Sequence, residues 1–148
     1  MSETQQDVVL QLSRRYDAPR ERVFDAWTSP EVLRRWLYGM PGWETPTAEV
    51  DLRVGGTIRI VMRDPSDGTE AGAAGEYTVV EPPHRLVFTW VWDDRPDEVQ
   101  LIELEFSERD GRTTVLMTNS AIPTDRRLKS QERGWQFCYD NLERLLAR

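Results

Sequence analysis

The sequence contains a single cysteine, Cys138, and a single histidine, His84. One cysteine excludes a disulfide within the chain, and the shortage of both residue types excludes a zinc site built from several Cys and His ligands. Nor does the chain offer a Ser-His-Asp or Cys-His motif that would mark a nucleophilic active site. We therefore expect no metal site and no cofactor.

Long apolar runs are also missing. No stretch approaches the roughly 20 apolar residues that a membrane helix needs, and the polar segment 1–7 lacks the features of a secretory signal. Basic residues are outnumbered, since 19 Lys and Arg against 26 Asp and Glu give a net charge of -7. A general nucleic-acid binder needs a basic surface. The sequence therefore predicts a cytoplasmic protein with no membrane insertion and no nucleic-acid partner.

The composition is typical of a folded domain, with 39% hydrophobic and 30% charged residues. A chain of 148 residues has the size of one domain and can bury a core without disulfides. No linker, internal repeat or low-complexity stretch divides it. We expect residues 1–148 to form a single domain.

The first part of the chain predicts a strand and two short helices. Apolar residues alternate within residues 8–16, which is typical of a strand. Pro19 indicates the start of one helix, and Ser29-Pro30 the start of another with Ser29 as its N-cap. Apolar residues follow both signals at helical spacing.

From about residue 45, turn signals separate short strands. Gly55-Gly56 is expected to join two strands by a tight turn, and Pro82-Pro83 and Asp110-Gly111 mark later turns. Short connections between successive strands indicate antiparallel pairing. The predicted strands cover residues 50–54, 57–63, 75–80, 85–92, 99–107 and 113–119.

The last segment predicts one long helix. Pro123-Thr124-Asp125 indicates its start, and an apolar stripe including Trp135 and Cys138 continues towards residue 148. The predicted fold class is α+β. A curved antiparallel sheet of about six to seven strands surrounds one long C-terminal helix, with two short helices after the first strand.

Several short stretches together resemble one family. They are Asp17-Ala18-Pro19, residues 23–30 with Trp36, Leu52 to Gly56, Arg85 to Trp90, and Gly134-Trp135. They are similar to bacterial homologues of the activator of the heat-shock-protein-90 ATPase, in the START-like (SRPBCC) superfamily of polyketide cyclases and lipid-transfer domains. The resemblance extends from about residue 8 to 147.

This resemblance implies a helix-grip fold with a cavity between the concave sheet and the long helix, roofed by the two short helices. It also implies that the cavity holds an apolar or aromatic small molecule. The loop after Trp36 departs from the common pattern of the family, so the resemblance does not specify the ligand. Fold alone does not determine function either.

Aromatic side chains supply the candidate binding residues. Ligand pockets are lined mostly by apolar and aromatic groups, although large aromatics also fill ordinary cores. We expect the irregular loop 38–47 to form a mobile lid that carries two of the candidates. The candidate ligand-binding residues are Trp36, Tyr38, Trp43, Trp90, Trp92 and Trp135.

The polar candidates have simpler interpretations. His84 follows two prolines at a turn, where we expect an exposed side chain. Cys138 lies in the apolar stripe of the last helix, where we expect a buried, unreactive thiol. Glu103 and Glu105 alternate with apolar residues and are expected to face water.

Two further features have open interpretations. Arg53, Arg59 and Arg63 form either a solvated face of a hairpin or, if one enters the cavity, an anchor for a ligand carboxylate. Gly134 lies inside the last helix, where glycine costs up to about 1 kcal/mol relative to alanine. It predicts a close approach of helix and sheet, or room for a ligand.

Three functions are compatible with these observations. The first is binding of a small apolar or aromatic molecule, as a carrier or sensor. The second is a co-chaperone-like interaction module whose acidic surface contacts a chaperone. The third is a cyclase or aromatase, in which Tyr77, Arg59 or Glu49 would polarise a carbonyl group. No motif selects those residues, so we assign no catalytic residue; a homodimer is compatible with each function.

Overall fold

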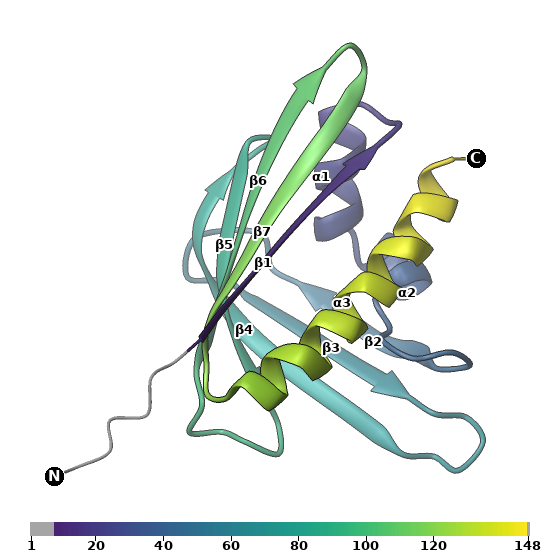
Figure 1. The fold of residues 1–148 in the computed structure, drawn as a ribbon, viewed down its shortest axis with the longest axis vertical. Helices are drawn as coiled ribbons and strands as arrows, with labels where there is room; N and C mark the ends of the chain where they lie inside the picture. The colour runs from purple at the N-terminus through teal and green to yellow at the C-terminus, as the bar shows by residue number, and fades with distance from the viewer. Residues whose placement is uncertain (1–7, 148) are drawn as a thin grey trace, which may run out of the picture.

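A computed structural model describes residues 8–147 (Figure 1). The elements are β1 (Val8–Tyr16), α1 (Arg20–Thr28), α2 (Pro30–Trp36), β2 (Glu44–Val50), β3 (Thr57–Arg63), β4 (Glu70–Glu81), β5 (Arg85–Trp92), β6 (Gln100–Arg109), β7 (Arg112–Ile122) and α3 (Asp125–Leu146). Their order is the one that the sequence predicts. The expectation about a secretory signal concerns residues 1–7, which lie outside the described residues.

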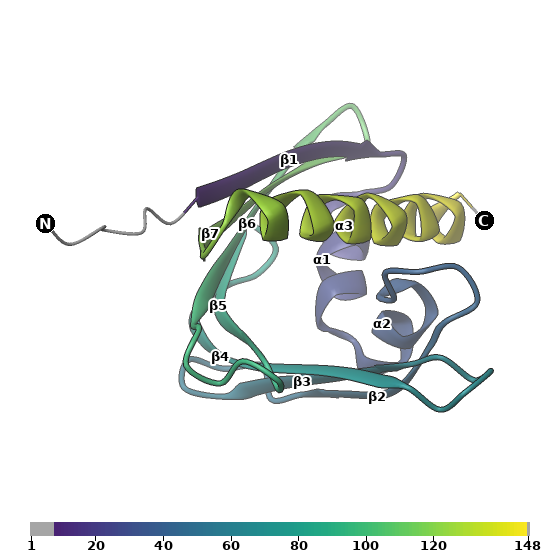
Figure 2. The same ribbon diagram turned by 60° about the horizontal axis from the view of Figure 1, so that its bottom comes forward.

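The strands form one seven-stranded sheet in the order β1-β7-β6-β5-β4-β3-β2. All neighbouring strands are antiparallel, and β1 joins the sheet by pairing with β7. The sheet curls, and Figure 2 shows α1, α2 and α3 on its concave side. The structure thus confirms the predicted α+β class, with a curved antiparallel sheet around a long C-terminal helix.

Strand β2 lies elsewhere than predicted. The expected strand at 50–54 is wrong, because the strand is Glu44–Val50 and residues 51–56 form the connection to β3. The sequence does not predict this strand, because Pro46 and its polar neighbours are typical of a loop. Because β2 is at the edge of the sheet, a proline is tolerated there, and the pairing with β3 shifts register between Glu44 and Thr47. The irregular loop is consequently shorter, covering 37–43 rather than 38–47.

The two short helices fill the space inside the curved sheet. Helix α1 buries Phe24 and Trp27, and α2 buries Leu33 and Trp36. Ser29 is the N-cap residue of α2, as predicted, but its side chain makes no cap hydrogen bond. Pro30 does occupy the first turn of α2, where a missing N–H has no cost.

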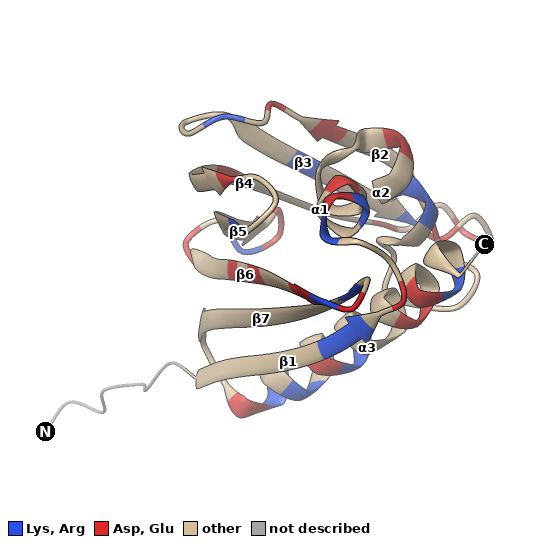
Figure 3. Ribbon diagram, turned by 90° about the horizontal axis from the view of Figure 1, so that it is seen from above, with Lys and Arg blue, Asp and Glu red and all other residues tan. Residues whose placement is uncertain are grey.

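Helix α3 spans 22 residues, which corresponds to a length on the order of 33 Å. Its N-cap is Thr124, whose hydroxyl oxygen accepts a hydrogen bond of 3.1 Å from the backbone N–H of Arg127. Trp135, Cys138 and Leu142 lie on its buried face. Figure 3 shows acidic and basic residues interspersed along the helix. Within residues 8–147, no helix has both the length and the apolar character needed to cross a membrane.

Candidate functional site

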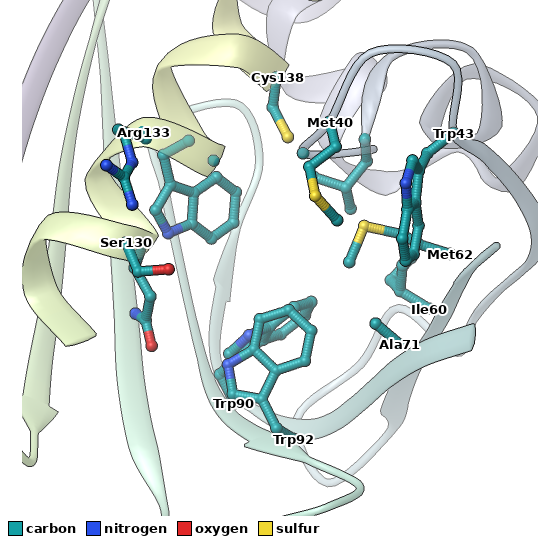
Figure 4. A pocket seen from close by; sticks show the side chains of 15 residues that line it. Met40, Trp43, Ile60, Met62, Ala71, Trp90, Trp92, Ser130, Arg133 and Cys138 are labelled. Carbon is teal, nitrogen blue, oxygen red and sulfur yellow. The ribbon is translucent and has the colours of Figure 1, made fainter. Parts of the chain in front are cut away.

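A cavity of about 300 Å³ lies between the concave face of the sheet and α3. Strands β3, β4 and β5 form one wall, α3 forms another, and loop 37–43 completes the enclosure (Figure 4). No residue of α1 or α2 lines it, so the roof implied by the resemblance comes from the loop after α2. The lining consists of Leu37, Gly39, Met40, Trp43, Ile60, Met62, Ala71, Trp90, Trp92, Ser130, Gln131, Arg133, Gly134, Trp135 and Cys138.

Predicted binding residues from three different segments meet in this lining: Trp43 from the loop, Trp90 and Trp92 from β5, and Trp135 from α3. The ring centroids of Trp90 and Trp92 are 5.6 Å apart, and those of Trp90 and Trp135 are 6.2 Å apart. Strand and helix therefore present a continuous aromatic surface. Figure 4 shows Trp43 across the cavity from Arg133 and Ser130, beside Met62. Their contact with a ligand stays a prediction.

The structure places the other two candidates outside this lining. Trp36 is fully buried, packs its ring 4.7 Å from that of Trp27, and donates its indole hydrogen bond to the backbone oxygen of Ala26. The ring centroid of Tyr38 lies 6.0 Å from that of Phe137 on α3. Helical spacing identifies Trp36 as buried but does not indicate whether it faces the core or the cavity. In this structure it belongs to the core.

A buried amide network lies behind the cavity wall. Asn119 and Gln100 are almost completely buried, and Asn119 Nδ2 donates to Gln100 Oε1 over 3.0 Å. Gln131, which lines the cavity, donates to Gln100 Oε1 at 3.0 Å and to Asn119 Oδ1 at 2.8 Å. Trp135 Nε1 donates to the same Asn119 oxygen at 3.3 Å. The network therefore holds Gln131 and the Trp135 indole in place at the wall.

Sequence reasoning missed Gln131 as a lining residue, because a glutamine on an amphipathic helix is expected to face solvent. The signal was nevertheless present. Gln131, Trp135 and Cys138 are separated by four and three residues, so they share one face of α3. All three line the cavity.

Gly134 lies where α3 meets the loop. A Cβ placed on Gly39 would be 3.4 Å from the Gly134 Cα, so the loop and the helix approach closely at these two glycines. A Cβ placed on Gly134 itself would have no heavy atom within 4 Å. Since Gly134 lines the cavity, its missing side chain leaves space there. The predicted close approach of helix and sheet is therefore wrong, because α3 meets the loop at this glycine. The alternative, that Gly134 leaves room for a ligand, stays a prediction.

The cavity contains no readily ionised nucleophile. Cys138 is its only cysteine, and burial raises the pKa of this thiol to about 12. The predicted burial of the thiol is thus confirmed, and its raised pKa disfavours the reactive thiolate form. The sulfur atoms of Met40 and Met62 add polarisable apolar surface near Trp43 (Figure 4).

The polar candidates lie elsewhere. His84 is exposed in the turn between β4 and β5. Glu105 is exposed, and Glu103 forms an ion pair of 3.2 Å with Arg85. Arg53 and Arg63 pair with Asp51 at 2.9 Å and with Glu44 at 3.6 Å, as expected of a solvated face.

The residues considered for a cyclase do not converge. Tyr77 is fully buried, its hydroxyl has no hydrogen-bond partner among the described residues, and it does not line the cavity. Glu49 is exposed on the edge strand. Arg59 binds Asp93 through both guanidinium nitrogens, at 2.6 and 2.8 Å. This hydrogen bonding raises the pKa of Arg59 and lowers that of Asp93, so both stay charged at neutral pH.

The Arg59–Asp93 pair borders a polar groove that adjoins the cavity. Ala71, Trp92, Ser130 and Gln131 line both hollows. The remaining groove residues come from β3, β4, the segment after β5, and the first turns of α3. The cavity thus has an apolar interior and a polar, charged neighbour.

A curved antiparallel sheet that encloses a cavity against one long C-terminal helix defines a helix-grip domain of the START-like (SRPBCC) type. The model of the family "Activator of Hsp90 ATPase homolog 1-like protein" matches residues 17–147, and the chain belongs to that family. This confirms the family suggested by the sequence stretches. A comparison with curated proteins gave no match.

Solved structures of bacterial proteins have the same fold. An AHSA1-like protein from Aeromonas hydrophila is 29% identical, with a TM-score of 0.75 over 91% of this chain and 90% of that chain. A protein from Rhodobacter sphaeroides is 27% identical, with a TM-score of 0.81 over 94% of this chain and 92% of that chain. A protein from Chromobacterium violaceum, at 23% identity, reaches 0.86 over 95% and 99% of the two chains and supports the fold alone.

Proposed function

We propose that this chain binds a small apolar or aromatic molecule in the cavity between the sheet and α3, as a carrier or sensor. The observation that carries the proposal is the convergence of Trp43, Trp90, Trp92 and Trp135 on one pocket. A core packed only for stability would bring these rings together without leaving a void, because protein interiors are close-packed.

The size and chemistry of the cavity support the same function. Its volume of about 300 Å³ is at the lower end of the roughly 300–1,000 Å³ typical of small-molecule sites. Met40 and Met62 can adapt to ligands of different shape, because methionine side chains are flexible. Met40 is also 46% exposed, which places an apolar side chain at the entrance.

The direct test is native mass spectrometry of the freshly purified protein, compared with its mass after denaturation. An extra mass that is lost on denaturation is the expected result, and it supplies the ligand for identification. A bare mass would favour the interaction-module hypothesis, and a chaperone pull-down would then follow.

Binding can also be measured with N-phenyl-1-naphthylamine, a neutral aromatic probe whose fluorescence rises in apolar surroundings. We expect Trp90→Ala to weaken its binding by about tenfold or more, because an indole wall is removed. That substitution also removes a nearly buried ring, which costs about 3–5 kcal/mol of stability. A variant that fills the cavity therefore serves as the second test.

Gly134→Leu is that variant, because a side chain at Gly134 projects into unoccupied space. We expect it to abolish probe binding while the circular dichroism spectrum stays native. Lys129→Leu, at an exposed position on the same helix, is the matched control and should bind as the wild type does. Wild-type affinity in both Gly134→Leu and Trp90→Ala would overturn the proposed site.

A further inference from the structure

Two arginines of α3, one at the cavity and one in the adjoining groove, form no ion pair with any residue that the structure describes. Arg126, Ser130 and Arg133 are spaced by four and three residues, so they lie on one face of α3. Arg133 lines the cavity, Arg126 lines the adjoining groove, and Ser130 lines both. Figure 4 shows Ser130 and Arg133 together on the α3 side of the cavity. Neither guanidinium forms an ion pair within residues 8–147.

The other arginines of the groove already have acidic partners. Arg59 is held by both oxygens of Asp93, and Arg127 contacts Glu98. Arg95 lies 3.9 Å from Asp94. Arg126 and Arg133 are therefore the guanidinium groups at the cavity and its adjoining groove that are available to an added anion.

The acidic lining residues place that anion on the helix side. Glu70, Asp93 and Asp94 belong to β4 and the segment after β5, across the groove from α3. Their negative charge disfavours an anion near the sheet. The α3 rim formed by Arg126, Ser130 and Arg133 offers two positive charges and a hydroxyl donor, which suit a carboxylate or a similar acidic group.

The interior of the cavity cannot accept the charge. Trp90, Trp135 and Cys138 surround it there, and an isolated ion in such surroundings is strongly disfavoured. The side-chain N–H groups behind the wall, on Gln100, Asn119, Gln131 and Trp135, already donate to amide oxygens within the network. An ionised ligand would thus bind with its apolar part inside and its charged group at the rim.

We propose that the ligand is an amphipathic anion, whose apolar or aromatic body occupies the cavity and whose single acidic group binds between Arg126 and Arg133. This inference rests on the proposed function, since it specifies the ligand class of the same cavity. It also replaces the earlier candidates for a carboxylate anchor, because Arg53, Arg59 and Arg63 each already have an acidic partner.

Two fluorescent probes with the same ring system test the acidic group. 8-Anilinonaphthalene-1-sulfonate carries one negative charge, and N-phenyl-1-naphthylamine is its counterpart without the sulfonate. We expect the anionic probe to bind about threefold to tenfold more tightly at low ionic strength, the range for two exposed charge contacts. The difference should shrink in 0.5 M NaCl, because salt screens exposed charges.

The variant Arg126→Gln/Arg133→Gln should lose the preference for the anionic probe and keep its affinity for the neutral one. Arg109→Gln/Arg112→Gln removes the same charge at the β6–β7 hairpin tip and should keep the preference. A different result is that the wild type binds both probes equally and that Gly134→Leu abolishes the binding of each. That result would overturn the amphipathic-anion proposal and leave the proposed function intact. Absence of binding by both probes would contradict the proposed function, and this inference with it.

Discussion

The indole nitrogen of Trp135 donates a hydrogen bond of 3.3 Å to Oδ1 of Asn119, a side chain with no exposed surface. The same oxygen accepts a hydrogen bond of 2.8 Å from Gln131. One residue of β7 thus orients two cavity-lining residues of α3. The interaction links the sheet to the helix at the level of the cavity, and it connects the stability of the fold to the shape of the site.

Replacement of Asn119 by alanine should therefore affect both stability and binding. The change leaves Trp135 Nε1 and a Gln131 donor without their partner, and buried unsatisfied groups cost about 1–3 kcal/mol. We expect a loss of about 2–4 kcal/mol in the free energy of unfolding, measured by urea denaturation. The neutral probe should also bind more weakly, because Trp135 is no longer oriented.

Thr118→Ala is the control for Asn119, since it changes the neighbouring residue on the opposite face of β7. Thr118 accepts a hydrogen bond of 3.3 Å from Gln11 in an exposed setting. Its replacement should cost less than about 0.5 kcal/mol. If Asn119→Ala and Thr118→Ala lose the same free energy of unfolding, the hydrogen bonds of Asn119 do not stabilise the fold as proposed.

Tyr77→Phe should keep or raise stability, although Tyr77 is fully buried. Its hydroxyl has no hydrogen-bond partner within the described residues, and removal of an unsatisfied buried group is favourable. We expect a change between zero and about +1 kcal/mol in urea denaturation. A loss above 1 kcal/mol would show that the hydroxyl has a bonding partner, such as an ordered water.

Tyr139→Phe gives the contrast. The hydroxyl of Tyr139 lies 2.8 Å from the sulfur of Met117. Removing this hydroxyl therefore removes a contact, whereas the hydroxyl of Tyr77 has no such contact among the described residues. Tyr139→Phe should therefore be less stable than Tyr77→Phe.

Much of the cavity could be predicted from the sequence, because β5 has a clear two-residue period. Trp90 and Trp92 alternate with outward residues, and both line the cavity. Edge strand β2 was hidden because Pro46 interrupts its pattern. An edge strand tolerates proline, whereas sequence reasoning treats proline as a break.

The position of Trp36 could not be predicted for a different physical reason. Helical periodicity identifies which face of α2 is buried, but Trp36 could contact either the core or the cavity from that face. Only the packing against Trp27 of α1 decides between them. Gln131 was missed because a polar side chain on an amphipathic helix is expected to face solvent. In the structure it lines the cavity and donates a hydrogen bond to Asn119.

Stability should decline in alkaline solution, in part through Cys138. Burial raises the thiol pKa from 9.0 to about 12, so the folded state favours the neutral form. Stability from this group is complete below pH 9 and is lost as the pH rises towards 12, because only the unfolded chain ionises there. Between about pH 9.5 and 10.5, the slope of unfolding free energy against pH should be steeper in the wild type than in Cys138→Ala, by about 1.4 kcal/mol per pH unit.

The comparison of slopes is more informative than absolute stability, because Cys138→Ala also removes buried volume. Tyr16, Tyr77 and Tyr139 have pKa values raised by burial as well. Tyr77, whose pKa is raised by burial alone, contributes equally in both proteins and cancels in the difference. Tyr16 and Tyr139 also interact electrostatically with Cys138, so the difference in slope reports the thiol together with this coupling. Identical slopes in the two proteins would mean that the thiol is open to solvent in the folded state.

Gly134→Ala should separate stability from binding. Alanine is favoured over glycine in a helix interior by about 0.5–1 kcal/mol, and the added methyl group meets no heavy atom within 4 Å. We therefore expect the midpoint of urea denaturation to rise. The methyl group enters the space beside Gly39 and Trp135, so a probe that fills the cavity should bind more weakly. Weaker binding together with a higher denaturation midpoint would show that glycine at this position keeps room for a ligand at the expense of helix stability. Unchanged affinity would show that ligands do not reach Gly134.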